Sequence, residues 1–491
     1  MTLSIGLDAA LSGLSTAADQ TSVVSRNVAR AGDPSASRKI ASLVTLPGGG
    51  VKLGPITRAT NSALYDKLLG ATSDASAQQA IVDALNLLDN TVNDPELDAS
   101  PAALVGKLAD AIHRYAAAPQ DATAARSAVA AAGDLARALN DATQAVQQLR
   151  TQADADIAGA TDRVNTLLAQ FETVNGEIVR GTRRGTDVTD YLDQRDQILA
   201  RIAEEVGVRT ITRANNDMAV YTDSGVTLFD VRARTVSFDR TLLYTPTTSG
   251  NAVYVDGVPI TGTSSGPMLA GSGRLTGLVA VRDGVAVTYQ SQLDEIARGL
   301  IQAFAESDQS ATPTLPDVPG LFTYAGAPAM PPPGSVLVGL AGTIKLNAGV
   351  DPAQGGNAAR LRDGGISGNP AYLYNASGAS GYTQRLEQVL DRLNAQQAFD
   401  PAAQAAPSGT VAGFAASSVS WLQEARKSAG ADGDYKTALK DRASEALSKS
   451  TGVNLDEEMT LLLELERSYQ ASTKLVSTID NMLGALLQAV G

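Results

Sequence analysis

The clearest pattern of apolar and polar positions occupies residues 455–491. Mostly apolar side chains recur there at alternating steps of three and four residues, and no proline interrupts them. The positions on this seam are Leu462, Leu465, Tyr469, Ser472, Val476, Ile479, Leu483, Leu486 and Val490. Such heptad spacing predicts one long helix. The apolar face is wider than a two-stranded seam requires, so we expect more than one neighbour for this helix. The additional apolar positions are Leu461, Leu475, Met482 and Leu487.

A helix start signal stands directly before this stretch. Asn454 can accept a hydrogen bond from a first-turn amide, and Glu457 follows three residues later, which is the spacing of a capping box. Asp456 and Glu458 also occupy the first turn, where acidic side chains favour a helix N-terminus. We expect these acids to cap the helix, with docking to another segment as the alternative.

Residues 1–30 repeat the pattern in a weaker form. The recurring positions are Leu7, Ala10, Leu14, Ala17, Thr21, Val24 and Val28. Gly6 and Gly13 lie one heptad apart on an adjacent row, where a missing side chain permits close helix contact. Each glycine costs a helix about 1 kcal/mol relative to alanine, so this helix is weak alone. We expect it to end near residues 32–34 (GDP), and residues 48–50 (GGG) to form a loop or hairpin.

The two ends therefore carry matching apolar stripes. A core helix of an ordinary domain is the alternative explanation for either stripe alone, and their pairing argues against it. We expect the two stripes to form an assembly interface. Its expected residues are Leu7, Leu14, Val24, Val28, Leu462, Leu465, Tyr469, Val476, Ile479, Leu483 and Leu486.

The middle of the chain is mainly helical in its periodicity. Residues 60–210 read almost entirely as helix, with an end expected at residues 93–95 (NDP) and an interruption at Pro119. Further helices are expected at 288–306, at 382–398 and at about 415–450. In the last of these, Gly430 and Gly433 indicate a possible break.

Two stretches depart from this helical pattern. From residue 211, short runs rich in β-branched and aromatic residues are bounded by Gly, Asp and Pro, which predicts strands. Residues 307–380 are rich in Pro and Gly, and we expect an irregular, exposed insertion there.

These patterns predict a mainly α fold with an inserted β domain. We expect an elongated multi-domain rod with paired, coiled-coil-like N- and C-terminal helices and a helical-bundle middle layer. The expected units are a terminal-helix assembly domain (1–35 plus 453–491), a helical-bundle domain (36–210 plus 285–310 plus 376–452), a β-rich outer domain (211–284) and a Pro/Gly-rich irregular insertion (311–375).

Composition narrows the classes of function. The chain has 491 residues and a formal net charge of -13, and this negative charge argues against a nucleic-acid partner. No apolar run is long enough to span a bilayer, and residues 1–14 lack a charged region followed by an apolar core. We therefore expect neither a membrane segment nor a conventional cleaved signal peptide. The chain has no cysteine, which excludes a disulfide framework and thiolate chemistry.

Candidate catalytic and ligand sites are few. His113 is the only histidine, so a Ser-His-Asp triad or a histidine metal site would need it. It stands in a helical segment, and we expect a partly buried structural histidine. Residues 271–277 (GSGRLTG) are similar to a dinucleotide-binding loop, but the third glycine is one position late and no clear βαβ unit is present. We expect a turn there, and we expect no enzyme: no catalytic residue, no cofactor and no metal ligand.

A cluster of charged residues follows the long helical stretch. Its members are Asp187, Asp190, Asp193, Arg195 and Asp196. Acid–base chemistry or a cation site is conceivable for such a cluster. Helical spacing instead indicates that Asp193 and Asp196 face outward, and Arg195 offers donors that would neutralise them. We expect pairing and capping groups that stabilise the helical core.

Several motifs resemble those of flagellar axial proteins. Residues 10–14 (ALSGL), 27–29 (NVA) and 37–38 (SR) resemble the N-terminal signature of flagellar rod, hook and hook-associated proteins. Arg30 and Ala36 depart from it, because the signature commonly has Asn and Tyr at these positions.

More specific motifs resemble the hook-associated protein 1 family, which forms the hook–filament junction. Residues 191–199 (YLDQRDQIL) closely resemble a motif of this family, as do residues 119–121 (PQD) with 125–129 (ARSAV). At the C-terminal end, residues 452–458 (GVNLDEE), 469–471 (YQA) and 479–480 (ID) resemble the end of the same family. The resemblance is loosest over 211–284 and 307–380.

This resemblance implies a structural adaptor that joins the hook to the filament of a bacterial flagellum. The implied partners are other copies of the chain, the flagellar hook protein, hook-associated protein 3 and a flagellar export chaperone, and no nucleic acid or membrane. The implied location is the extracellular flagellum, reached by type III export without a cleaved signal peptide. Another axial protein, such as hook-associated protein 3 or a flagellin-like protein, is the alternative.

Overall fold

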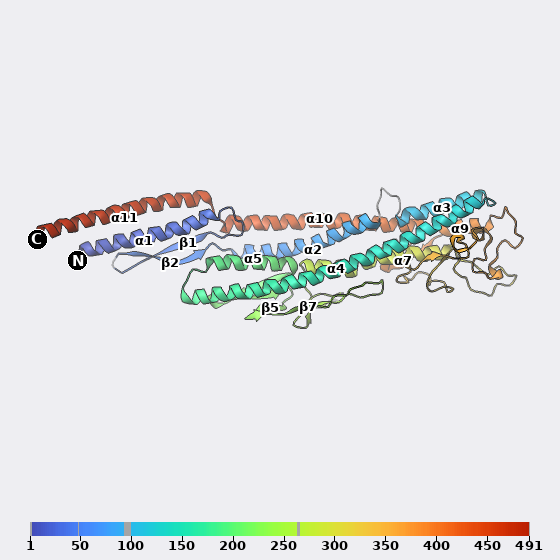
Figure 1. Ribbon diagram of the computed structural model, residues 1–491, viewed down its shortest axis with the longest axis horizontal. Coiled ribbons are helices and arrows are strands. Elements are labelled where there is room, and N and C mark those ends of the chain that lie inside the picture. Colours follow the sequence, from blue (N-terminus) through green and yellow to red (C-terminus); the bar gives the residue numbers. More distant parts are fainter. Residues whose placement is uncertain (1, 48, 93–99, 263–265, 491) are drawn as a thin grey trace.

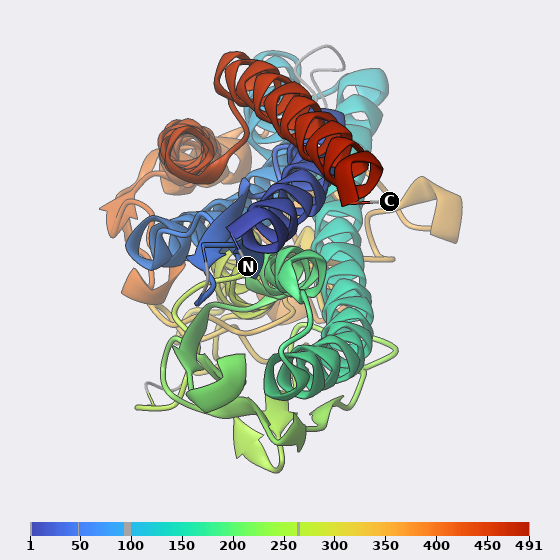
Figure 2. The same cartoon turned by 90° about the vertical axis from the view of Figure 1, so that its left-hand side faces the viewer.

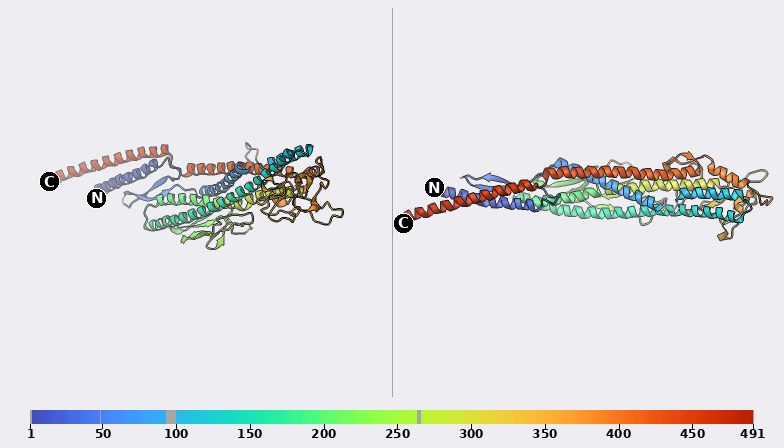
Figure 3. Two further views of the ribbon diagram at one scale, coloured as in Figure 1. Left: turned by 45° about the vertical axis from the view of Figure 1, so that its right-hand side comes forward. Right: turned by 90° about the horizontal axis from the view of Figure 1, so that it is seen from above.

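The structure, a computed structural model, describes residues 2–47, 49–92, 100–262 and 266–490. Gly48 of the expected hairpin and the helix end expected at residues 93–95 lie outside this part of the chain. The molecule is an elongated rod, and both chain ends lie at the same end of it (Figures 1 and 3). The mainly α, rod-like fold predicted from the sequence is confirmed.

The two terminal helices lie side by side, as predicted. They are α1 (Thr2–Ala29) and α11 (Leu455–Val490), and they pack against each other beyond the end of the bundle (Figures 1 and 2). An antiparallel hairpin, β1 (Lys39–Thr45) and β2 (Val51–Arg58), follows α1 and packs on it. Thr16 on α1 donates a hydrogen bond to the Val51 carbonyl at 3.1 Å, so helix and hairpin form one unit.

Long helices run along the rod and form the bundle. They are α2 (Ser62–Val92), α3 (Pro101–Ala117), α4 (Ala122–Arg184), α5 (Thr189–Glu205), α7 (Ala286–Ala303) and α10 (Val411–Thr451). Local signals account for the ends of α4. The Asp121 side chain accepts a hydrogen bond from the Thr123 amide, and Gly185 ends the helix in the left-handed conformation at φ 71°.

The expected break in α10 is absent, because this helix is continuous through Gly430 and Gly433. Gly433 faces α2, where an added Cβ would lie 3.4 Å from Val82 Cγ2. Gln78 of α2 also donates to the Ala429 carbonyl at 3.0 Å. Packing against α2 therefore overrides the low helix propensity of the two glycines.

Two small antiparallel sheets lie along α4 (Figure 1). The first contains β3 (Val208–Thr212), β4 (Met218–Thr222), β5 (Thr227–Asp230) and β6 (Arg232–Ala233), with the turn η1 (Ala214–Asn216) between β3 and β4. The second contains β7 (Val236–Phe238), β8 (Val253–Val255) and β9 (Val258–Pro259). Their buried side chains share one apolar cluster with α4 and α5, and Phe229 meets Phe171 edge-on with ring centroids 4.9 Å apart.

The expected β-rich range 211–284 extends too far toward the C-terminus. Its last part folds as α6 (Arg274–Ala280) and the π-helical turn η2 (Val281–Val285). Both pack on α2 and α4, as bundle elements do. At the other boundary β3 begins at Val208, slightly before the predicted start.

The Pro/Gly-rich insertion is irregular, as predicted, but it is not simply exposed. Its short elements are β10 (Phe322–Thr323), β11 (Lys345–Leu346), η3 (Pro352–Gln354), α8 (Arg360–Asp363) and η4 (Pro370–Tyr372). Phe322, Leu340 and Ile344 are buried in the main apolar cluster. Phe322 packs edge-on against Phe304 of the bundle, with ring centroids 5.3 Å apart.

The chain returns from the insertion to α10 through a short connecting region. This region contains α9 (Gln384–Asn394), η5 (Pro401–Ala403) and the strand pair β12 (Gln397–Ala398) and β13 (Ser408–Gly409).

Candidate assembly surface

Glycines bring α1 and α11 close together, as the sequence predicted. A Cβ added at Gly6 would lie 3.6 Å from Ile479 Cδ1, and one added at Gly13 would lie 3.4 Å from Ser472 Oγ. The contact between the stripes is therefore already formed within one chain.

The residues expected at the interface divide by exposure. Val24 and Leu465 are buried, with 3% and 6% of their surface exposed. The partly buried residues are Leu7, Leu14, Val28, Leu462, Val476, Ile479 and Leu483. Tyr469 and Leu486 are exposed, at 45% and 54%. The side chain of Val490 lies outside the part of the chain that the structure describes.

Further apolar side chains of α11 remain exposed after α1 has covered the seam. Leu475, Met482 and Leu486 follow one another at spacings of seven and four residues, so they form one row on the helix. Leu455, Met459 and Leu463, near the start of the helix, form a second exposed row at spacings of four. Of the four residues that widen the predicted apolar face, Leu475, Met482 and Leu487 are exposed, whereas Leu461 is partly buried.

Some exposed apolar positions were not identified from the sequence. Ile5 and Leu11 on α1 are 51% and 45% exposed, and both lie off the predicted seam. Ile40, Leu43 and Val44 on β1 are also exposed. For Ile5 and Leu11, the sequence did offer a signal, because each is an apolar residue outside the predicted seam. The hairpin offered no such signal, because its apolar residues follow no helical period.

A cluster of charged side chains attaches the terminal helices to the bundle. We call it the junction cluster; it consists of Arg30, Lys39, Arg58, Asp190, Asp193 and Asp196. The Asp193 carboxylate on α5 is only 1% exposed and lies 3.3 Å from Arg30 Nη1 and 3.0 Å from Arg58 Nη1. Three cations from the N-terminal segment therefore meet an acidic face of the bundle.

The other acids of α5 extend this cluster outward. Asp190, which is largely exposed, lies 3.1 Å from Arg30 Nη1 and also pairs with Lys39. Asp196 lies 2.7 Å from Arg58 Nη2. Asp187, which lies just before α5, is 3.1 Å from Arg26 Nη1 and accepts a hydrogen bond from the Thr189 amide at 3.0 Å.

Burial and charge act against each other in this cluster. Burial lowers the pKa of Lys39, although Asp193 attracts the ammonium. Burial opposes the charge on Arg58, but Asp196 and Asp193 outweigh it and raise the pKa of the guanidinium. Burial raises the pKa of the Asp196 carboxyl, and Arg58 offsets part of this effect.

The expectation that Asp193 and Asp196 face outward is wrong. The polar face of α5 is covered by Arg30 and Arg58, which are far from it in the sequence. Arg195 directs its hydrogen bonds elsewhere: it donates to Asn175 Oδ1 at 3.0 Å and to the Asn216 carbonyl at 2.6 Å. Its charge acts on Asp196 only through space, where it helps to offset the effect of burial on the pKa of that carboxyl. The expected role in pairing is confirmed, with different partners. The expected role in capping is not, because no side chain caps the start of α5.

The acids at the start of α11 dock as well as cap. The Asn454 side chain accepts from the Asp456 amide at 3.0 Å, as an N-cap does. Glu458, which is fully buried, accepts from Arg38 Nε at 2.6 Å and from Asn27 Nδ2 at 3.0 Å. Glu457 lies 3.1 Å from Arg38 Nη1. Capping alone therefore does not explain Glu457 and Glu458, and the alternative of docking describes them better.

The remaining candidate sites contain no reactive arrangement. His113 is exposed rather than partly buried. Residues 271–273 form a bend, but residues 274–277 are the first turn of α6, so the turn expected over 271–277 is confirmed only for its first part. Within the described residues, no helix could cross a membrane and no group of His, Cys, Asp and Glu could hold a metal ion.

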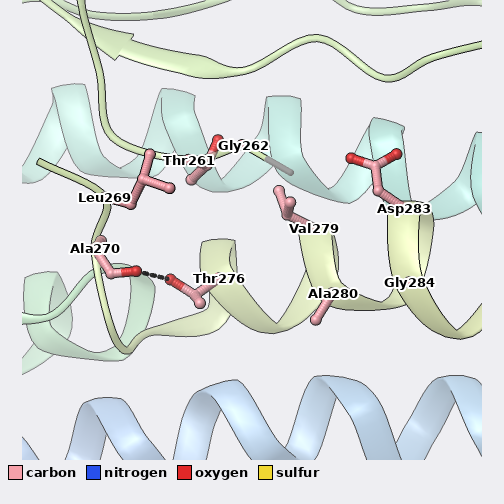
Figure 4. Close-up of a pocket in the computed structure, with 9 residues that line it drawn as sticks. All are labelled: Thr261, Gly262, Leu269, Ala270, Thr276, Val279, Ala280, Asp283 and Gly284. Carbon is pink, nitrogen blue, oxygen red and sulfur yellow. Dashed lines mark hydrogen bonds between the residues drawn. The ribbon is translucent and has the colours of Figure 1, made fainter. Parts of the chain in front are cut away.

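A cavity of about 310 Å³ lies beside α6 and η2 (Figure 4). Its lining residues are Thr261, Gly262, Leu269, Ala270, Thr276, Val279, Ala280, Asp283 and Gly284. Thr276 already donates to the Ala270 carbonyl, and Asp283 pairs with Arg282 at 2.7 Å. The lining thus lacks the convergent polar groups that orient a bound small molecule.

Comparisons with known proteins agree with this architecture. Residues 72–314 match the family model for the flagellar hook-associated protein FlgK helical domain. Residues 444–489, the end of α10 and nearly all of α11, match the model for the flagellar basal body rod FlgEFG protein C-terminal region.

Individual relatives belong to the same group. Flagellar hook-associated protein 1 of Escherichia coli (strain K12) is 21% identical over 297 residues, which cover 58% of this chain and 51% of the relative. The match thus spans about half of that relative's length. The structure of the flagellar hook junction protein FlgK from Burkholderia pseudomallei shares the fold, with a TM-score of 0.57 and 16% identity over 78% of this chain and 99% of that chain. The chain is thus similar to the flagellar hook-associated protein 1 family, in its helical domain at residues 72–314 and in its fold.

Proposed function

We propose that this chain is a structural, non-enzymatic adaptor of the bacterial flagellum that joins hook to filament and assembles through its terminal helices. One observation carries the mechanism: α11 keeps two apolar rows exposed although α1 already covers its seam. An isolated rod gains nothing from exposing leucines in rows, whereas neighbouring copies could cover them.

The energy of covering these side chains favours cooperative assembly. Burying one Leu or Met side chain contributes roughly 1.5–3 kcal/mol. A single contact does not offset the freedom lost on association, so several rows must be covered at once. Leu475, Met482 and Leu486 provide one row, and Leu455, Met459 and Leu463 provide another.

We assign two roles to the expected interface residues, according to whether each is buried or exposed in the single chain. Val24 and Leu465, which are buried, hold α1 and α11 together within one chain. Tyr469 and Leu486, which are exposed, contact neighbouring copies. The partly buried residues of the seam lie next to both the α1–α11 contact within one chain and the contact with neighbouring copies.

The partners follow from the family. Besides other copies of the chain, we propose the flagellar hook protein on one side, hook-associated protein 3 on the other, and a flagellar export chaperone before assembly. The location is the extracellular flagellum, reached through the flagellar export apparatus. The alternative is another axial protein, and the match of residues 444–489 to rod proteins keeps it open because it covers a C-terminal segment common to several axial components.

Aspartate substitutions separate assembly from folding. Combined Leu475→Asp and Met482→Asp should leave the monomer folded but block assembly, because a buried charge without a partner is costly. Cells producing only this variant should form hooks and release filament subunits into the medium, as electron microscopy and analysis of the medium would show.

Two variants serve as comparisons for this test. Leu465→Asp should weaken the α1–α11 pair in the monomer itself, which circular dichroism would detect. Val231→Asp, at a turn of the β layer where the valine is 81% exposed, should assemble normally. Normal filaments on cells producing the Leu475/Met482 variant would refute assembly through this row.

A further inference from the structure

A loop of the β layer exposes two consecutive leucines. Leu242 and Leu243 lie shortly after β7, and they are 75% and 74% exposed. Scattered exposed apolar residues are normal on a protein surface, so exposure alone does not make these two a contact site. The way in which the loop is held supplies the second observation. We call residues 239–243 the leucine loop.

Asp154 anchors the chain directly before and directly after the two leucines. Its carboxylate on α4 is fully buried and accepts hydrogen bonds from the Thr241 amide and from the Tyr244 hydroxyl, both at 2.7 Å. Thr241 precedes Leu242, and Tyr244 follows Leu243. The exposed pair is therefore fixed in position relative to α4.

Two buried arginines hold the chain beyond this point. Arg150 of α4 donates to the Thr248 carbonyl at 2.7 Å, and Arg282 of η2 donates to the Asn251 carbonyl at 2.8 Å. Arg282 also pairs with Asp154 at 2.7 Å. Buried ion pairs lose hydration and contribute little to stability by themselves. Here they order the loop before any partner binds, which lowers the entropy lost on binding.

A second exposed surface lies on α10. Tyr435 is 64% exposed, and three other exposed residues share its side of the helix at spacings of three and four. We call these four residues the tyrosine face; they are Ala431, Asp432, Tyr435 and Ala438. The middle of α10 and β7, from which the leucine loop leaves, lie at the same level of the rod on opposite sides (Figure 1).

Contacts across the bundle support this placement. Arg282, which holds the loop, lies five residues after Gly277, and Gly277 packs against the backbone of Ala77 on α2. The next residue of α2, Gln78, accepts a hydrogen bond at 3.4 Å from Lys436, which is adjacent to Tyr435. The two surfaces are thus connected through one cross-section of the bundle.

We propose that the leucine loop of one copy packs on the tyrosine face of a neighbouring copy, as a lateral contact in addition to that of α11. The inference rests on the proposed function, because it requires copies assembled side by side. Both surfaces belong to one chain and lie on opposite sides of it, so the contact is heterologous. Such a contact repeats from copy to copy around a ring or along a helix.

The charges on the two surfaces are complementary. Arg240 of the leucine loop and Asp432 of the tyrosine face are both exposed, and so is Asp239 beside Arg240. Arg442, also exposed, follows Tyr435 by seven residues on the same side of α10. Each surface therefore has one charge of each sign beside its apolar centre. Two copies can dock here without like charges meeting, although each carries a net charge of -13.

Cysteine cross-linking of assembled junctions tests this contact, because the chain has no cysteine of its own. The variant carries Leu243→Cys together with Tyr435→Cys, and hook–filament particles from cells producing only this variant are oxidised with a copper catalyst. We expect covalent dimers, trimers and larger multimers on a denaturing gel, because each copy offers one cysteine to each neighbour. A disulfide requires Cβ atoms about 4 Å apart, so its formation reports direct contact.

Control variants separate this contact from chance collisions. Either cysteine alone should give no multimers. Val231→Cys with Tyr435→Cys moves the first cysteine to another exposed position of the β layer, and it should also stay monomeric. A double variant that is present in the particles but remains monomeric would overturn the lateral contact and leave the proposed function intact. Absence of the wild-type chain from filament-bearing particles would refute the proposed function, and the lateral contact with it.

Charge reversal provides a second test that needs no cysteine. Arg240→Glu and Asp432→Arg should each lower the shear at which filaments detach from cells, because each places like charges together in the contact. The two substitutions combined should restore the wild-type value, because the pair forms again with reversed signs. Losses that simply add in the combined variant would contradict pairing between these two residues and thus the proposed contact.

Discussion

Asp294 shows at the scale of a single residue how the irregular insertion is held on the bundle. Its carboxylate, 1% exposed on α7, accepts hydrogen bonds from the amides of Gly339 and Ala341, both at 2.8 Å. Gln290 donates to it at 3.1 Å. Burial nevertheless raises the pKa of Asp294 to about 6, because these bonds only partly offset the loss of water.

This shift predicts a measurable pH dependence. The folded state binds the proton more tightly than the unfolded state, whose pKa is near 3.8. The contribution of Asp294 to stability is therefore fully present below pH 4 and is lost as the pH rises through about 6. Between pH 7 and pH 4, the free energy of unfolding of the wild type should rise relative to that of Asp294→Asn by about 2 kcal/mol.

Denaturant unfolding of both proteins across this pH range would measure the difference. Because other carboxyls titrate in both proteins, only the difference between the two curves reports Asp294. A difference that stays constant with pH, or that falls as the pH is lowered, would contradict this assignment.

At the scale of elements, the contact between α6 and α2 depends on Gly277. A Cβ added there would lie 2.9 Å from the carbonyl carbon of Ala77 on α2, closer than real Cβ contacts. Gly284, in η2, has no described atom within 4 Å of an added Cβ. The two glycines thus form a matched pair in neighbouring helical segments.

Gly277→Ala should destabilise the protein by about 1–3 kcal/mol, because backbone atoms must move apart to admit the methyl group. Gly284→Ala should be neutral or stabilising by up to about 1 kcal/mol, because alanine favours helix over glycine. Thermal unfolding of the two variants compares them directly. Equal effects of the two substitutions would show that α6 does not pack this closely on α2.

Elements with local signals could be predicted from the sequence. The start of α11 at Leu455 follows from the cap Asn454 and from the apolar period. The continuity of α10 through Gly433 could not be predicted, because it depends on packing against Val82 of a distant helix. The buried residues of the Pro/Gly-rich insertion could not be identified from the sequence either, because an irregular segment has no periodic apolar pattern.

At the scale of the whole molecule, the sequence indicated which residues share a face but not what covers that face. The acids of α5 were recognised as a cluster, and the hook-associated protein 1 motif pointed to the same place. Their cations, Arg30 and Arg58, lie more than a hundred positions earlier in the chain. The pairing of α1 with α11 was predicted because both stripes have the same period, whereas the rows left exposed required the structure.

The overall shape connects these scales. A bundle with its β layer forms the body of the rod, and α1, the β1–β2 hairpin and α11 extend from one end of it (Figure 3). In this arrangement the exposed rows of α11 project beyond the body, where other copies can reach them without disturbing the bundle.

A reconstruction of an assembled hook–filament junction containing this chain tests assembly through α11 most directly. We predict that the terminal helices lie innermost and that Leu475 and Met482 are buried against terminal helices of neighbouring copies. The α1–α11 pair seen in the single chain should persist, with Gly6 facing Ile479 and Gly13 facing Ser472. A junction in which this face of α11 is open to solvent, while other surfaces connect the copies, would contradict the proposed assembly.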